Sequence, residues 1–136
     1  MFEIDIASYN TWKCDGDYPK RLSIIHNKLN SLNMDVVLLQ EVFSSEDDQY
    51  NTLQQLYPTT DDKFIISHKA RGKTRTVEKE SLYSYSSLAL VSKHPIISHG
   101  IFTLPGHPED RHRMCQWGLI SISSVSYTHL TLPTTR

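Results

Sequence analysis

The stretch "VVLLQE" at residues 36–41 decides the fold that we expect for this chain. Four consecutive apolar residues are typical of a strand that is buried on both of its faces. This strand leads directly into Gln40 and then into the carboxylate of Glu41. A buried strand that leads into a charge either reaches the surface there or brings that charge to a functional site.

The residues before this stretch predict a strand, a helix and then the buried strand. "FEIDIAS" at residues 2–8 alternates apolar with polar residues, which indicates a half-buried strand. After a loop with an Asp-Gly turn, Pro19 marks the first turn of a helix that ends at Asn33. Its apolar residues recur at helical spacing, at Leu22, Ile25, Leu29 and Leu32. A helix that connects two neighbouring strands implies that the strands run parallel.

The remainder of the chain adds one helix and several strands. We expect Ser44 or Ser45 to cap a second helix that ends before Pro58. The charged stretch at residues 68–80 has the composition of a loop. Strands are expected at residues 64–67, 86–92, 96–104 and 116–123. The fold class is therefore mixed α/β.

Length, composition and charge limit the classes of protein that remain. A chain of 136 residues with 38% apolar residues suits one soluble globular domain. A net charge of −1 argues against a protein that binds nucleic acid or anionic membranes through its overall charge. There is no apolar run near the ~20 residues of a membrane helix, and the N-terminus does not resemble a secretory signal. Two distant cysteines, Cys14 and Cys115, form no disulfide framework, so we expect a cytoplasmic protein.

Asn10 and Glu41 are the residues that we expect to carry chemistry. Each follows a predicted strand, and parallel strands would place both residues at the same edge of the sheet. A carboxylate with an amide oxygen and water molecules suits Mg²⁺, which prefers oxygen ligands and keeps much of its hydration. The alternative is that Glu41 is a solvated strand end and Asn10 a turn residue, and spacing alone leaves both interpretations open.

The sequence resembles a known family at these positions. "SYNTWKCDGDYPKR" and "NMDVVLLQEVF" are similar to the opening of the endonuclease/exonuclease/phosphatase superfamily, the metal-dependent phosphoesterases related to DNase I and neutral sphingomyelinases. Asn10, Arg21 and Leu39-Gln40-Glu41 match the family pattern in order, and "SSLALVSKHPI" resembles the next segment, with Ser87 in place of a glycine. The resemblance implies a four-layer α/β/β/α sandwich, of which residues 1–123 would be the N-terminal half.

The resemblance also implies a chemistry, which is attack of water on phosphorus. Glu41 would be a ligand of Mg²⁺, for which Mn²⁺ can substitute, and Asn10 would lie beside the metal and the scissile phosphate. Arg21 would have a structural role. The family takes its catalytic base from segments resembling Gly-Asp-Phe-Asn and Ser-Asp-His, and neither string occurs in this sequence. We therefore expect this chain to be inactive by itself.

The last residues need separate consideration. "SYTHLTLPTTR" resembles the family's Thr-His-Leu segment, which would make His129 a phosphate-contacting or acid residue. Only ten residues separate Gly118 from His129, and they contain no glycine, asparagine or aspartate for a tight turn between two strands. "YTHLTLPTT" also resembles a translated sequencing adapter. We therefore expect residues 124–136 to be a non-native tail.

Other residues give less specific indications. Lys69, Arg71, Lys73 and Arg75 could contact a nucleic-acid backbone, although such a run is more often a solvated loop. Trp12 could line a substrate site, but a buried aromatic residue is the commoner explanation. We retain Trp12, Arg71 and Lys73 as candidate substrate contacts. The spacing of His107, His112 and Cys115 does not make a zinc site, because a fourth ligand is not evident.

The sequence thus leads to a main hypothesis and two alternatives. The main hypothesis is a metal-dependent phosphodiesterase, either a nuclease or a sphingomyelinase-like enzyme. The first alternative keeps the fold but takes a phosphomonoester, such as an inositol phosphate or a nucleotide. The second is a short non-catalytic protein that binds a metal or a partner.

Overall fold

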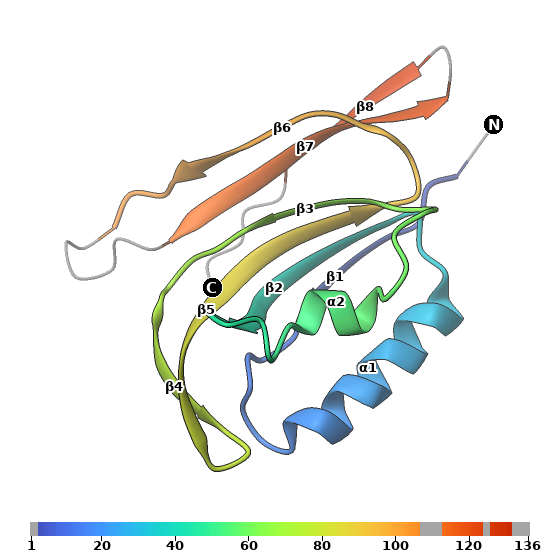
Figure 1. Cartoon of the computed structure of the whole chain (residues 1–136). Helices are drawn as coiled ribbons and strands as arrows, with labels where there is room; N and C mark the ends of the chain where they lie inside the picture. The colour runs from blue at the N-terminus through green and yellow to red at the C-terminus, as the bar shows by residue number, and fades with distance from the viewer. Residues whose placement is uncertain (1–2, 107–112, 124–125, 132–136) are drawn as a thin grey trace.

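Helices and two β-sheets are layered in the computed structural model, which describes residues 3–106, 113–123 and 126–131 (Figure 1). The helices cover one face of the first sheet, and the second sheet lies on its other face (Figure 1). The mixed α/β fold expected from the sequence is confirmed. The elements are β1 (Ile6–Asn10), α1 (Tyr18–Leu32), β2 (Val36–Ser45), α2 (Thr52–Leu56), β3 (Phe64–His68), β4 (Lys73–Val77), β5 (Glu80–Ser92), β6 (Ile96–Thr103), β7 (Met114–Ser123) and β8 (Ser126–Thr131).

The first sheet has the strand order β1-β2-β5-β3, with β4 paired to the other part of β5. β1 and β2 run parallel, and Asn10 lies opposite Gln40. The parallel arrangement predicted from the helix between them is confirmed. The carboxyl end of β1 therefore lies beside the middle of β2.

β2 is buried on both faces, as its apolar run predicts. Val37 and Leu39 belong to the core beneath the helices, together with Leu22 and Ile25 of α1. Val36 and Leu38 belong to a second core between the two sheets, with Leu90 and Ile120. Because its side chains enter both cores, β2 joins all three layers. Burial of each such side chain contributes roughly 1.5–3 kcal/mol.

α1 begins and ends where the sequence indicates. Asp17 caps its first turn by accepting a hydrogen bond from the Lys20 N–H at 3.4 Å, and Pro19 lies where no N–H is needed. Asn33 ends the helix in the left-handed conformation with φ 51°, and its N–H donates to the carbonyl of Leu29.

The second helix begins later than predicted. Ser44 and Ser45 do not cap it, because β2 continues through both residues, which pair with Tyr85 and Ser84 of β5. The helix α2 is instead capped by Asn51, whose side chain accepts from the Gln54 N–H. Pairing with a long neighbouring strand has outweighed the local capping preference.

The prediction of a loop at residues 68–80 is also wrong. Residues 73–77 form β4, which pairs with residues 80–84 of β5. Glu78 and Lys79 connect the two strands with φ values of 48° and 68°. Two consecutive left-handed residues are typical of a type I′ hairpin turn, which usually contains glycine or asparagine. Because this turn has neither residue, a hairpin could not be recognised here from the residue types alone.

The second sheet has the order β6-β7-β8 and is antiparallel throughout. β7 and β8 form a hairpin in which Gly118 lies opposite Leu130 and Ser123 opposite Ser126. The argument that ten residues are too few for such a hairpin is therefore wrong. The boundary of a non-native tail at residue 124 remains a prediction.

Candidate functional site

Glu41 lies within β2, and not beyond its end as we expected. Leu39 pairs with Ala89 and Val42 pairs with Ser87, so Gln40 and Glu41 together face the single residue Leu88 of β5. Two residues opposite one define a β-bulge. The charge is therefore placed at an interruption in a strand that continues for four residues more.

The backbone of Glu41 has the left-handed conformation, with φ 52°. A side chain at such a position costs on the order of 1–3 kcal/mol, which the surrounding structure must offset. A bulge of this kind bends the strand and changes the direction of its side chains. Glu41 nevertheless remains buried, with 7% of its side chain exposed. These observations favour the hypothesis that the strand brings this charge to a site.

The loop after β1 holds the bulge in place. Thr11 is buried, and its hydroxyl lies 2.8 Å from the carbonyl oxygen of Glu41 and 3.0 Å from that of Gln40. The Thr11 N–H also donates to Gln40, and the Lys13 N–H donates to the Glu41 carbonyl at 3.0 Å. Hydrogen bonds from one short loop thus fix both residues of the bulge.

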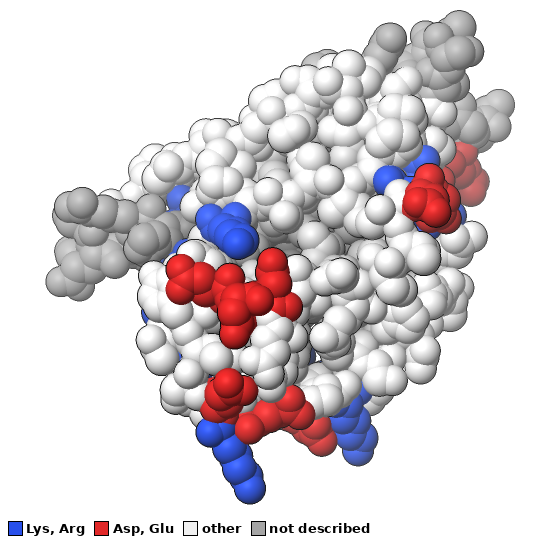
Figure 2. Space-filling view, in the orientation of Figure 1, with Lys and Arg blue, Asp and Glu red and all other residues white. Residues whose placement is uncertain are grey.

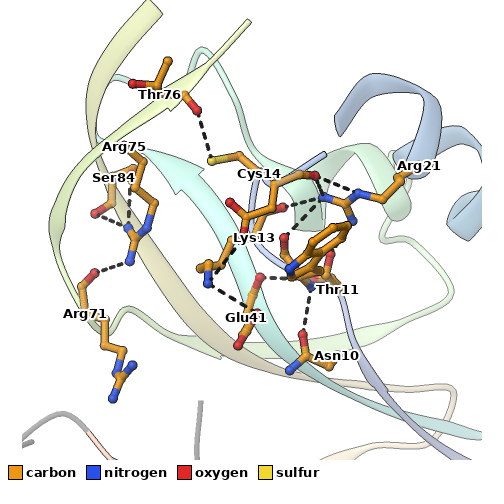
Figure 3. A network of polar contacts seen from close by, with 12 residues as sticks. Asn10, Thr11, Lys13, Cys14, Arg21, Glu41, Arg71, Arg75, Thr76 and Ser84 are labelled. Atoms are coloured by element: carbon orange, nitrogen blue, oxygen red, sulfur yellow. Dashed lines mark hydrogen bonds and ion pairs between the residues drawn. The ribbon is translucent and has the colours of Figure 1, made fainter. Parts of the chain in front are cut away.

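Asn10 is exposed at the end of β1, next to the bulge (Figure 3). Its side-chain oxygen accepts a hydrogen bond from the Trp12 N–H at 2.9 Å. Its amide nitrogen has no hydrogen-bond partner in the described part of the chain. Asn10 therefore presents a donor beside the carboxylate of Glu41, and a donor is suited to an anionic oxygen.

Arg21 has the structural role expected of it. Its guanidinium lies 4.9 Å from the centre of the Trp12 ring. It donates hydrogen bonds of 2.6–3.3 Å to the backbone carbonyls of Thr11, Trp12, Lys13 and Asp15. α1 thereby fixes the loop that holds the bulge. Trp12 is 51% exposed, so the interpretation as a buried aromatic residue is wrong, and its contact with substrate stays a prediction.

One cation, Lys13, contacts the Glu41 carboxylate, and the charge of a second, Arg75, interacts with that of Glu41. The ammonium of Lys13 lies 3.8 Å from Oε2 of Glu41 and 3.5 Å from Oδ2 of Asp15, and Figure 3 shows its two ion-pair contacts. Arg75 is the second cation. Burial lowers the pKa of its guanidinium, whereas the charges of Cys14, Asp15 and Glu41 act to raise it. The ammonium of Lys13 thus partly compensates the burial of the Glu41 carboxylate.

The basic run is not the solvated loop that we expected. Arg75 is buried and donates hydrogen bonds to the backbone and hydroxyl oxygens of Ser84 and to the carbonyl of Arg71. Lys69 lies over the ring of Tyr85, with its ammonium 4.9 Å from the ring centre. Lys73 is exposed at the start of β4. The roles of Arg71 and Lys73 as substrate contacts remain predictions.

Surface charge does not indicate a polyanion site on the helix-covered face. Figure 2 shows acidic side chains gathered where β2 leads into α2 and near the β4–β5 turn, with separate basic groups at the margins of these acidic areas. Residues 46–48 in the first of these segments are exposed acids. This mixed pattern gives no continuous basic track for a phosphate backbone.

The structure does not test the predicted role of His129 in this site. Its backbone lies in β8 opposite Leu119, in the second sheet, and its side chain lies outside the described residues. His107 and His112 of the rejected zinc spacing also lie outside the described residues, and Cys115 is buried.

The residues present fit a hard divalent cation. In the described ranges there is no group of three His, Cys, Asp or Glu side chains that could hold a metal. Mg²⁺ does not need such a group, because it is commonly held by one or two carboxylates and keeps several water molecules. The Glu41 carboxylate already lies beside the ammonium of Lys13, which shows that positive charge is accommodated there. Glu41 supplies a carboxylate ligand of the right kind, and the side-chain oxygen of Asn10, which accepts from the Trp12 N–H with one lone pair, has a second lone pair for the cation.

Sequence reasoning missed three residues of this arrangement. Thr11, Lys13 and Asp15 lie in the loop after Asn10, and two of them contact the Glu41 residue directly. Their position was the only feature of the sequence that could have indicated a role for them. They lie between Asn10 and α1, in a segment that the parallel pairing of β1 and β2 places beside Glu41. The bulge that turns Glu41 has no sequence signature of its own.

A known protein family matches most of this chain. The model of the Endonuclease/Exonuclease/phosphatase family matches residues 7–127. No curated protein sequence matches the chain significantly. No helix in the described part is long and apolar enough to cross a membrane.

Solved structures show the same fold. An endonuclease/exonuclease/phosphatase family protein from Leptotrichia buccalis has a TM-score of 0.69 at 13% identity, over 98% of this chain and 54% of that one. TDP2 from Caenorhabditis elegans has a TM-score of 0.59 at 21% identity, over 99% of this chain and 37% of that one. A mannosyl-6-phosphatase from Bacteroides thetaiotaomicron has a TM-score of 0.56 at 16% identity, over 87% and 46%. This chain therefore spans between about a third and a half of the length of these similar structures.

Proposed function

The chain belongs to the endonuclease/exonuclease/phosphatase family, and on that premise we propose that it carries the metal-binding part of a Mg²⁺-dependent phosphoester hydrolase. The family consists of hydrolytic phosphoesterases that generally use divalent metal ions. Mn²⁺ is a substitute that suits the same oxygen ligands.

One observation carries the proposal. The buried Glu41 carboxylate is held at a bulge directly beside Asn10, by the hydrogen bonds of a single loop. A strained, buried carboxylate at a strand interruption is costly to maintain, and such arrangements cluster at functional sites. A solvated strand end would require neither the burial nor the bulge.

The two residues would have different roles. When bound, the divalent cation supplies positive charge that neutralises a phosphate oxygen as the transition state forms. Glu41 would hold that cation with one carboxylate. Asn10, with its side-chain oxygen accepting from Trp12, would donate its amide N–H to a non-bridging phosphate oxygen. The Thr11 hydroxyl would keep the Glu41 backbone in position.

Phosphodiesters are the first substrate class to test, and phosphomonoesters are the second. The diester follows from the sequence resemblance to nucleases and sphingomyelinases. The monoester is supported by the name of one similar structure, a mannosyl-6-phosphatase. A non-catalytic protein that binds metal or a partner remains the third hypothesis.

The test uses the protein encoded by the complete gene and two model substrates. Bis-p-nitrophenyl phosphate reports diester hydrolysis, and p-nitrophenyl phosphate reports monoester hydrolysis, each with Mg²⁺ and with EDTA. Glu41→Gln should lower kcat/KM by about 100-fold or more. Glu46→Gln, which removes an exposed carboxylate just after β2, should leave it unchanged. Activity that survives EDTA, or that both variants retain, would contradict the proposal.

A further inference from the structure

Lys13 is a residue that the proposed function does not use. It follows Trp12 in the loop after β1, and both have left-handed backbones, with φ 61° for Trp12 and 49° for Lys13. Its N–H donates to the Glu41 carbonyl, and its own carbonyl accepts from Arg21. The backbone of Lys13 is therefore fixed at both of its polar groups, and only the side chain is left to move.

The side chain of Lys13 lies between two carboxylates. Its ammonium is 3.8 Å from Glu41 and 3.5 Å from Asp15. The two carboxylates differ in environment, because the Glu41 side chain is 7% exposed and that of Asp15 is 45% exposed. A divalent cation can replace the ammonium in its ion pair with Glu41. The ammonium can then remain paired with Asp15, which it already contacts.

Arg75 cannot make the same movement. It is buried, and its guanidinium donates to backbone and hydroxyl oxygens on β5 and to the carbonyl of Arg71. The Lys13 side chain is 29% exposed, and within the described ranges it is held by ion pairs alone, at distances longer than those of a usual hydrogen bond. Lys13 can therefore leave Glu41 at small cost, whereas Arg75 is fixed by its hydrogen bonds to other residues.

We infer that Lys13 is the counter-ion of Glu41 in the metal-free protein, and that it moves to Asp15 when a divalent cation binds at Glu41. This inference rests on the proposed function and adds a residue that controls metal affinity. Lys13 stabilises the buried carboxylate while no metal is bound and competes with the metal for it. Asp15 favours the metal-bound form by holding the displaced ammonium.

A double-mutant cycle tests the inference through metal binding alone. The dissociation constant of Mn²⁺ is measured by electron paramagnetic resonance for the full chain and its variants. Lys13→Met keeps the length of the side chain but removes the charge, and should bind Mn²⁺ about tenfold more tightly. Lys13→Arg keeps the charge and should bind as the parent does. Thermal melts of each variant verify that the fold is retained.

Asp15 distinguishes the exchange from a general electrostatic effect. Asp15→Asn should weaken Mn²⁺ binding about threefold in the parent chain, because Lys13 then stays on Glu41. In the Lys13→Met background, Asp15→Asn should leave the Mn²⁺ dissociation constant almost unchanged, because no ammonium has to be displaced from Glu41. An equal effect of Asp15→Asn in both backgrounds would overturn the exchange and show that Asp15 attracts the metal directly.

The remaining outcomes separate the inference from the proposed function. Binding that is equally tight in the parent, Lys13→Met and Lys13→Arg would overturn the inference and leave Glu41 as a metal ligand. If the parent and all variants fail to bind Mn²⁺, the metal site and the inference fall together. Binding that appears only in Lys13→Met would support the inference, because removal of the competitor has exposed the site.

Discussion

At the scale of single residues, the site is organised by polar contacts that fix backbone and side chains together. Thr11 holds the carbonyl of Glu41, and the N–H of Trp12 holds the side-chain oxygen of Asn10. The same principle operates beneath the basic strand β4, where Ser84 binds Arg75. Each contact satisfies a buried or constrained polar group. Removing one partner leaves the other group without a hydrogen bond, and this lowers stability by more than an average hydrogen bond contributes.

Two buried serines of β5 allow a matched test of that statement. The Ser84 hydroxyl accepts from Arg75 at 3.0 Å and donates to the Lys73 carbonyl at 3.1 Å. The equally buried Ser86 hydroxyl has no hydrogen-bond partner among the described residues. Ser84→Ala should lower the free energy of unfolding by about 1–3 kcal/mol, and Ser86→Ala should leave it unchanged or raise it. Urea denaturation measures both, and equal losses would contradict the assignment.

At the scale of elements, a loop, a bulge and a hairpin turn determine where the side chains of Glu41 and Arg75 lie. The loop after β1 is a separate unit that joins α1 to the bulge of β2, through Arg21 on one side and Thr11 on the other. The turn between β4 and β5 aligns Arg75 with Ser84.

The loop can be weakened without altering its shape. Thr11→Val keeps the volume of the side chain but removes the hydroxyl that bonds to the carbonyls of Glu41 and Gln40. The free energy of unfolding should fall by about 1–2 kcal/mol, and Mn²⁺ should bind more weakly because Glu41 is less well fixed. Thr74→Val, at an exposed position of β4, is the control and should change neither. A Thr11 variant as stable as the control would show that the hydroxyl does not hold the bulge.

A glycine in the β4–β5 turn should increase the stability of the protein. Lys79 is exposed with φ 68°, which favours glycine. Lys79→Gly should raise the free energy of unfolding by about 0.5–1 kcal/mol, whereas Lys73→Gly, in the extended strand β4, should lower it by about the same amount. Thermal melts compare the two, and a destabilised Lys79→Gly would contradict the strained turn.

Patterns that depend on burial could be predicted, and those that depend on unusual backbone could not. The run Val36–Leu39 is buried on both faces because four apolar residues in a strand have no other stable environment. The proximity of Asn10 and Glu41 follows from the parallel strands. The bulge at Glu41 and the turn at Glu78 and Lys79 use left-handed residues other than glycine, and tertiary pairing imposes that conformation without a local signature.

At the scale of the whole molecule, the ends of three strands of the first sheet are joined at the edge away from Glu41. Asp35 lies just before β2 and accepts a hydrogen bond from the Asp5 N–H, before β1, at 2.9 Å. Its other oxygen lies 3.0 Å from Nε2 of His94, which follows β5. The Asp5 hydrogen bond and then the His94 contact lower the pKa of the Asp35 carboxyl. A single carboxylate therefore ties these strands together.

This lowered pKa makes a contribution to stability that depends on pH. The ionised carboxylate is favoured in the folded protein, so its contribution is present above the unfolded pKa, near 4, and is lost as the pH falls through the lower folded value. Asp35→Asn should reduce the melting temperature at pH 6, and the difference from the parent should shrink steadily as the pH falls below about 4. Asp61→Asn, at an exposed carboxylate, should show no such trend. A difference that is constant with pH would contradict this linkage.

The central claim is that Glu41 is a ligand of a divalent cation, and the most direct measurement is a Mn²⁺ titration of the ¹⁵N-labelled chain followed by NMR. Paramagnetic broadening should begin at the amides of Asn10, Trp12 and Glu41, which surround the carboxylate. Glu41→Gln should abolish this local broadening, and Glu46→Gln should preserve it. Broadening that persists around Asn10 in Glu41→Gln, or that centres elsewhere in the parent chain, would contradict the claim.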